Sequence, residues 1–194
     1  MNIMALDPGL RGGIAILNEE GKPVFTSEMP IINIGDKGQK IMDVKSIQII
    51  IQDHLPEYCF LEKVHSMPGQ GVVSTFSFGM GYGMVMSAII LNAKHLELIY
   101  PQHWQRHVLD PIPKWETMTP KVRAKNKFTQ LWPDLAAMDM KHDGIIDALL
   151  LAEYGRRTRV LGEEDHGVEA KQRRKRIRRT GTAAAGRRDN TILD

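Results

Sequence analysis

The chain has 194 residues, 42% of them apolar, and a formal net charge of +3, so it is long enough for one domain with an ordinary hydrophobic core. No run looks long and apolar enough to span a membrane, and the N-terminus lacks the features of a signal peptide, so we expect a cytoplasmic protein with no membrane partner. The single cysteine, Cys59, excludes an intrachain disulfide framework and a multi-cysteine metal site.

The positive charge is concentrated near the end of the sequence. Residues 168–194 carry nine Lys or Arg and three Asp or Glu, a charge of +6, so residues 1–167 carry −3. We expect a folded body over residues 1–157 and a basic, disordered tail over residues 158–194. An acidic body with a basic tail suits metal-assisted chemistry on a polyanion, and a passive solubility tail is the plain alternative.

Residues 1–17, MNIMALDPGLRGGIAIL, read as a strand, a glycine-rich turn and a second strand. The first apolar run ends at Asp7, where Asp7-Pro8-Gly9 is a strong turn signal. A strand that is apolar on both faces is typical of the centre of a sheet. It would place Asp7 at the edge of the sheet where ligands collect in α/β folds, unless Asp7 only begins a turn.

The rest of the body alternates strands and helices, which predicts an α/β fold. We expect strands over residues 23–29, 58–61 and 96–100, and helices over residues 43–54, 74–92, 102–108, 119–131 and 142–157, with Asp43, Ser74 and Thr119 as N-caps. Residues 30–38, 63–73 and 109–118 read as loops. Gly79, Gly81 and Gly83 interrupt one helix and predict close packing or close approach of a ligand there.

Carboxylates follow two of the predicted strands and begin the last helix. Glu62 ends the buried strand over residues 58–61, as Asp7 ends the first strand. Asp143 and Asp147 lie four residues apart and therefore share one face of a helix. Favourable interaction with the helix dipole explains Asp143 well, but Asp147 lies among apolar residues, where an unpaired charge is costly.

Four carboxylates without a cysteine cluster or a paired histidine motif indicate a hard cation bound through oxygen, namely Mg²⁺, with Mn²⁺ able to substitute. Phosphodiester hydrolysis commonly uses two such ions, one activating water and one stabilising the leaving oxygen. In that scheme the acids are metal ligands, and metal binding relieves their mutual repulsion.

Four motifs occur in one order along the chain. They are LDPG with the following Gly-Gly in residues 6–13, LEKVHSMPGQG in residues 61–71, TPKVRAKNKFTQLWPD in residues 119–134 and HDGIIDALLLAEYGRR in residues 142–157. With them the chain resembles the RuvC-like Holliday junction resolvases of the ribonuclease H-like superfamily, and most of all those carried by bacteriophages. The resemblance covers nearly all of residues 1–157.

The resemblance implies a ribonuclease H-like domain over residues 1–157, with a mixed five-stranded sheet flanked by helices. It implies a homodimeric crossover junction endodeoxyribonuclease of DNA recombination and repair. This enzyme would use two Mg²⁺ ions to nick four-way junctions and other branched DNA. By motif position Asp7, Glu62, Asp143 and Asp147 would be the catalytic metal ligands.

Two departures from the family pattern concern single positions. Cellular members place the fourth acid three residues before Asp147, which is Gly144 here, so Asp143 would serve instead, with His142 as a weaker substitute. The position of the family's aromatic wedge is His65. Family members also place basic residues near the scissile phosphate. The candidates for this role here are Lys114 and Lys121, with Arg106 behind them, and each is equally consistent with a solvated surface residue.

Two other functions fit parts of the sequence. An actin-like ATPase fragment would use Asp7 to orient Mg²⁺-nucleotide, but the chain is too short for two such domains and has no second Asp-x-Gly hairpin. A non-catalytic binder of branched DNA would use the basic tail and would show no metal-dependent turnover. ATP binding and metal-dependent cleavage, respectively, distinguish these two from the nuclease.

Overall fold

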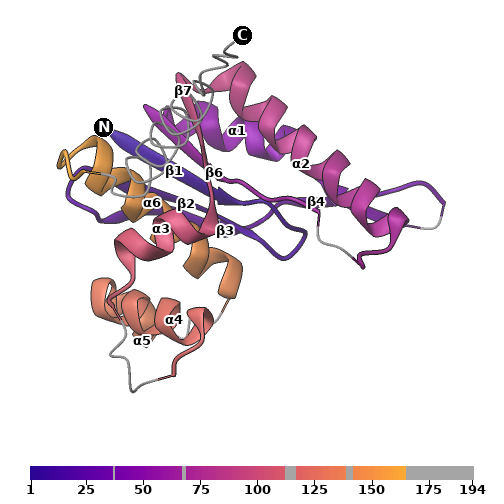
Figure 1. Ribbon diagram of the computed structural model, residues 1–194. Coiled ribbons are helices and arrows are strands. Elements are labelled where there is room, and N and C mark those ends of the chain that lie inside the picture. Colours follow the sequence, from indigo (N-terminus) through magenta and orange to yellow (C-terminus); the bar gives the residue numbers. More distant parts are fainter. Residues whose placement is uncertain (37, 67–68, 112–116, 139–141, 165–194) are drawn as a thin grey trace, which may run out of the picture. The chain divides into compact units, whose positions relative to one another are not determined.

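The central sheet has five strands in the order β3-β2-β1-β6-β7 (Figure 1). The strand β2 (Gly13–Asn18) is antiparallel to its two neighbours β1 (Asn2–Asp7) and β3 (Pro23–Glu28), whereas β6 (Tyr58–Glu62) and β7 (His95–Ile99) run parallel to β1. This arrangement confirms the expected mixed five-stranded sheet. The computed structural model describes residues 1–36, 38–66, 69–111, 117–138 and 142–164.

β1 lies at the centre because both of its faces are apolar. Ile3 and Ala5 face one core layer, and Met4 and Leu6 face the other; all four side chains are fully buried. The alternation follows from the two-residue period of a strand. Cys59 of β6 is equally buried, as expected for a small apolar residue.

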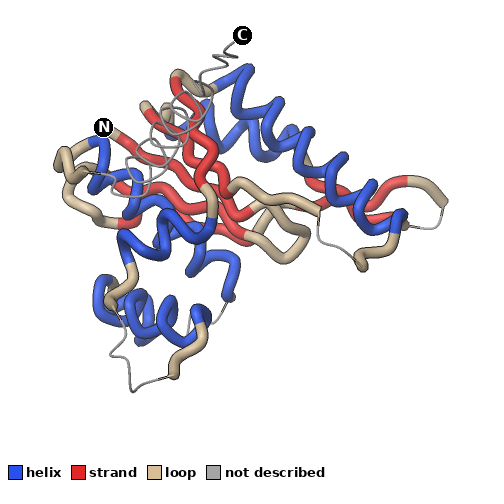
Figure 2. The backbone as a smooth tube through the Cα atoms, in the orientation of Figure 1, coloured by secondary structure: helices blue, strands red, loops and turns tan. Residues whose placement is uncertain are grey.

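Helices cover both faces of the sheet (Figure 2). The layer of Met4 and Leu6 packs under α1 (Val44–His54) and α2 (Val72–Asn92). The layer of Ile3 and Ala5 packs under α3 (Pro101–Val108), α4 (Pro120–Leu131) and α6 (Asp143–Arg159). The N-caps Asp43 and Thr119 are confirmed, since each side chain accepts hydrogen bonds from the first turn of its helix.

Three elements differ from those expected. The predicted loop over residues 30–38 is wrong, because β4 (Ile31–Ile34) and β5 (Gln39–Met42) form a hairpin whose turn uses Gly35 and Gly38 at positive φ. The helix α2 begins at Val72 with Gly71 as its N-cap, so the Ser74 cap is wrong. No helix is expected between residues 131 and 142, but Pro133 begins the short helix α5 (Pro133–Ala137).

The expectation that no run is long and apolar enough to span a membrane is corrected by α2. By length and composition alone this helix could cross a membrane, although a core helix of a globular protein passes the same test. Its inner side buries Val85, Ala88 and Ile89 against the sheet layer.

Of the three glycines of α2 expected to pack closely, only Gly81 does so. A Cβ on Gly81 would lie 3.2 Å from Met42 Cε, whereas Gly79 and Gly83 have open space around them.

Met1–Glu163 form one compact unit. The predicted body ended at residue 157, and α6 continues to Arg159. The predicted basic tail falls mainly on residues 165–194, which lie outside the described residues.

Candidate active site

Asp7 and Glu62 end neighbouring parallel strands and project from the same face of the sheet. Leu6 pairs with Leu61, so Asp7 and Glu62 occupy the next step of the β1–β6 ladder. Side chains alternate along a strand, and Ile3, Ala5 and Phe60 belong to the layer under α6. Asp7 comes two residues after Ala5, and Glu62 comes two residues after Phe60. Both acids therefore lie on the side of the sheet that α6 covers.

The start of α6 rests directly on the turn between β1 and β2. Gly12 and Gly144 form a backbone bridge, and a Cβ on Gly13 would lie 2.7 Å from the Gly144 carbonyl carbon. A Cβ on Gly144 would lie only 2.5 Å from the Arg11 carbonyl oxygen. These glycines allow the close approach that holds Asp147 beside Asp7, and they leave no room for a side chain at position 144.

Asp7, Glu62 and Asp147, called the inner acids below, interact electrostatically. Burial, and then the charge of Glu62, raise the pKa of Asp7 to about 7. Burial, followed by the charges of Asp7, Glu62 and Asp143, raises the pKa of Asp147 to about 7. Burial also raises the pKa of Glu62, opposed by a hydrogen bond that Trp104 Nε1 donates to Glu62 Oε1 at 2.9 Å. The structure therefore brings Asp7, Glu62 and Asp147 together.

Asp143 lies at the rim of a cleft next to the inner acids, and its neighbours are lysines instead of acids. It forms ion pairs with Lys121 and, at 3.2 Å, with Lys125, and its side chain is 43% exposed. The hydrogen bond from Lys121 is the main cause that lowers the pKa of Asp143. These groups line a cleft of about 260 Å³ whose walls also include Asp147 and Gln105. The cleft therefore has cationic groups beside acidic ones.

The chemistry of the inner acids fits a divalent cation. Among the described residues, no group of three or more His, Cys, Asp or Glu side chains is placed so that it could hold a metal ion. Asp7, Glu62 and Asp147 nevertheless supply hard oxygen donors. Burial opposes the ionised form of all three, and repulsion from neighbouring acids adds to this at Asp7 and Asp147. A bound cation would relieve that repulsion, so the donor set suits Mg²⁺, and these ligand roles stay a prediction.

The other predicted residues are placed as follows. Lys121 lies at the cleft, and Arg106 is exposed on α3 next to the cleft residue Gln105. His65 is exposed in the loop after β6. Lys114 lies outside the described residues.

Sequence reasoning missed two residues of the site. Lys125 lies one helical turn after Lys121, and this spacing already placed both on one face of α4. Trp104 is fully buried on α3, which directly follows β7, the strand beside Glu62. Its only signal was an aromatic residue just after the neighbouring strand.

If Glu62 binds Mg²⁺, Trp104→Phe is expected to weaken that binding about tenfold, because Glu62 loses the donor that orients it and favours its ionised form. The measurement is the melting temperature of the protein as a function of Mg²⁺ concentration. Trp132→Phe is the matched control, since Trp132 is also buried and donates at 2.9 Å to the Gly21 carbonyl oxygen, away from the acids. An equal shift in both variants would show that lost stability is the cause.

The sheet order and the helices on its two faces form a RuvC-like fold of the ribonuclease H type, as two solved structures show. The chain is similar to Thermus thermophilus RuvC solved in complex with Holliday junction substrate, with a TM-score of 0.54 and 12% identity over 82% of this chain and 98% of that chain. It is also similar to a second Thermus thermophilus RuvC structure, with a TM-score of 0.53 and 15% identity over 82% of this chain and 96% of that one. Neither protein-family models nor curated protein sequences match the chain.

Proposed function

We propose that the protein is a metal-dependent, structure-selective endodeoxyribonuclease that nicks four-way junctions and other branched DNA. The observation that carries this proposal is the convergence of Asp7, Glu62 and Asp147, where burial, and then the charges of neighbouring acids, raise the pKa of Asp7 and Asp147 to about 7. The fold supports it, because a RuvC of this fold has been solved with Holliday junction substrate.

The residues would divide the work as follows. Asp7, Glu62 and Asp147 would hold two Mg²⁺ ions, and Trp104 orients Glu62 through its hydrogen bond. Bound Mg²⁺ supplies positive charge that stabilises the leaving oxygen and lowers the pKa of the attacking water. Lys121 contacts the scissile phosphate from the rim, and Asp143, which now pairs with Lys121, completes the acidic set.

The test is cleavage of a labelled synthetic four-way junction with and without Mg²⁺, beside a linear duplex and a Y-shaped branch. We expect Mg²⁺-dependent nicking of the junction and the branch, and an intact duplex. Nicking of the junction alone would narrow the proposal to a strict resolvase. Tight junction binding without cleavage at any Mg²⁺ or Mn²⁺ concentration would contradict it and favour a non-catalytic binder.

We further propose that the enzyme is a homodimer joined through α2. Val72, Phe76, Ile90 and Leu91 are exposed, each by 60% or more, and helical spacing places them on one side of α2. Gly79 and Gly83 lie on the same side with open space around them, and small residues at this spacing let two helices approach closely. A second copy would cover this apolar stripe.

Leu91→Glu is expected to convert the dimer to a monomer, because it places a charge in the apolar stripe. Sedimentation equilibrium at micromolar concentration measures the mass. Leu161→Glu is the control, since Leu161 is exposed beyond the end of α6. A wild-type chain that sediments as a monomer would refute the dimer.

We further infer that the protein acts in the cytoplasm, in DNA recombination and repair. The assignment to bacteriophage enzymes rests on the motifs of residues 61–71 and 142–157 alone.

A further inference from the structure

A groove of about 500 Å³ lies between the β4–β5 hairpin, the first half of α2 and the turn after β1. The hairpin contacts α2 through β5, and the two lie side by side (Figure 1). Apolar side chains, among them Leu10, Ile41 and Phe78, line most of the groove. Its volume is within the range of pockets that bind small molecules.

The polar groups of the groove favour an anion. Arg11 and Lys40 line it, and none of its described lining residues is acidic. Within the described part of the chain neither cation forms an ion pair, and both side chains are exposed. An apolar wall with an aromatic ring and two unneutralised cations matches a nucleotide, whose base is flat and apolar on its faces and whose phosphate is anionic.

The groove is continuous with the candidate active site through one short turn. Arg11 belongs to the turn that joins Asp7 to Gly13, and its carbonyl oxygen lies against Gly144 at the start of α6. A strand whose phosphate lies at Asp7 would therefore have a neighbouring nucleotide within reach of Arg11. At a branch point, bases that have lost their partners cost less to unstack than paired bases.

We propose that this groove binds an unpaired nucleotide of the DNA strand beside the cleaved phosphate, with its base against Phe78 and its phosphate between Arg11 and Lys40. This proposal rests on the proposed nuclease function and adds a basis for branch selectivity. The enzyme would favour branches that offer an unpaired nucleotide over branches that are paired up to the junction.

The test uses a four-way junction with 2-aminopurine as an unpaired base at the branch point, in EDTA so that no strand is cut. Binding is followed by anisotropy, and release of the base from the DNA stack by an increase in 2-aminopurine fluorescence. Ser77→Trp fills the groove, since Ser77 lines it, and should abolish the fluorescence increase. Lys40→Gln should weaken binding about 3- to 10-fold and reduce the salt dependence by about one ion.

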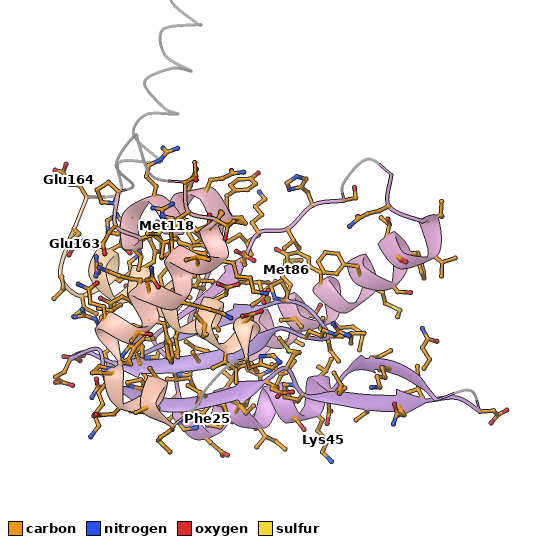
Figure 3. All side chains as sticks on the ribbon, turned by 90° about the horizontal axis from the view of Figure 1, so that it is seen from below. Phe25, Lys45, Met86, Met118, Glu163 and Glu164 are labelled. Atoms are coloured by element: carbon orange, nitrogen blue, oxygen red, sulfur yellow. The ribbon has the colours of Figure 1, made fainter. Side chains whose placement is uncertain are left out.

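Lys45→Gln is the matched control for Lys40→Gln. Lys45 is exposed on α1 and points away from the fold (Figure 3), and it does not line the groove. We expect wild-type affinity and fluorescence. Melting curves of all variants exclude a folding defect as the cause of a lost signal, and Lys40→Gln changes only an exposed side chain.

Three results would overturn the inference. They are wild-type fluorescence and affinity in both groove variants, an equal loss in Lys45→Gln, and conversion of a dimer to a monomer by Ser77→Trp, which would assign the groove to a second copy of the chain. Failure of the nuclease proposal is a separate result, namely no Mg²⁺-dependent cleavage by the wild-type protein.

Discussion

Asp7→Asn is expected to abolish Mg²⁺-dependent cleavage and, at the same time, to stabilise the metal-free protein at pH 8. Loss of a charged metal ligand at the centre of the site should lower the cleavage rate by about 10³-fold or more. The stability gain has an electrostatic cause: burial and Glu62 raise the pKa of Asp7 to about 7 in the folded chain. Above that pH the folded state carries an unfavourable charge that Asn lacks.

The size of this gain follows from linkage. The folded-state pKa of Asp7 is about 7 against an ordinary value of 3.8, so ionisation at pH 8 opposes folding by on the order of 4 kcal/mol. Removing the charge should recover part of that amount, and chemical denaturation in EDTA measures it. Asp53→Asn, at an exposed position of α1, is the control and should change neither stability nor cleavage.

Opposite changes in activity and stability distinguish a functional acid from a structural one. If Asp7 only began a turn, Asp7→Asn would leave cleavage intact. If Asp7 held the fold together, the variant would melt at a lower temperature than the wild type. Either result would remove Asp7 from the site.

The sheet and the three inner acids could be predicted because their signals are local. The apolar runs that end at Asp7 and Glu62 each predicted a buried strand with an acid at its end. Parallel pairing of β1 with β6 then brings both acids to one edge without further information. Asp147 was predictable because its neighbours on α6 are apolar, and a buried acid needs a partner.

The rest depended on contacts between distant residues. No local pattern showed that Gly144 must be a glycine, because the reason is the backbone of Arg11 and Gly12 more than a hundred residues earlier. The same contact explains why no side chain fits at position 144, where the resemblance to cellular RuvC-like resolvases predicts an acid. Asp143 instead lies at the rim with Lys121 and Lys125, partners that come from another helix.

The hairpin β4–β5 differs from the predicted loop for another reason. The glycines at 35 and 38 favour turns, and a turn-rich stretch with few residues on either side is typical of a loop. The flanking Ile31, Ile32 and Ile34 are β-branched residues that suit a strand, and each is about 40% exposed. A short strand with an exposed apolar side has no alternation to mark it, so the pairing of β4 with β5 and the place of β5 in the groove come from the structure.

The metal-free protein is expected to lose stability as pH rises from 5 to 8, and Mg²⁺ is expected to reverse this loss. Asp7 and Asp147 both have a folded-state pKa of about 7, raised from 3.8. Between these values the folded chain binds more protons than the unfolded chain, so the free energy of unfolding falls with pH. The fall is complete above about pH 7, and it corresponds to a melting temperature lower by about 10 °C.

Added Mg²⁺ should raise the melting temperature strongly at pH 8 and little at pH 5, because the ion binds the ionised carboxylates that repel each other without it. Thermal melting across this pH range, in EDTA and in Mg²⁺, measures both effects without DNA and without catalysis. The variant with both Asp7→Asn and Asp147→Asn is the control, and its melting temperature should vary less with pH and not respond to Mg²⁺. A wild-type protein that becomes more stable toward pH 8 in EDTA, or that ignores Mg²⁺ there, would show that these acids do not form a metal site.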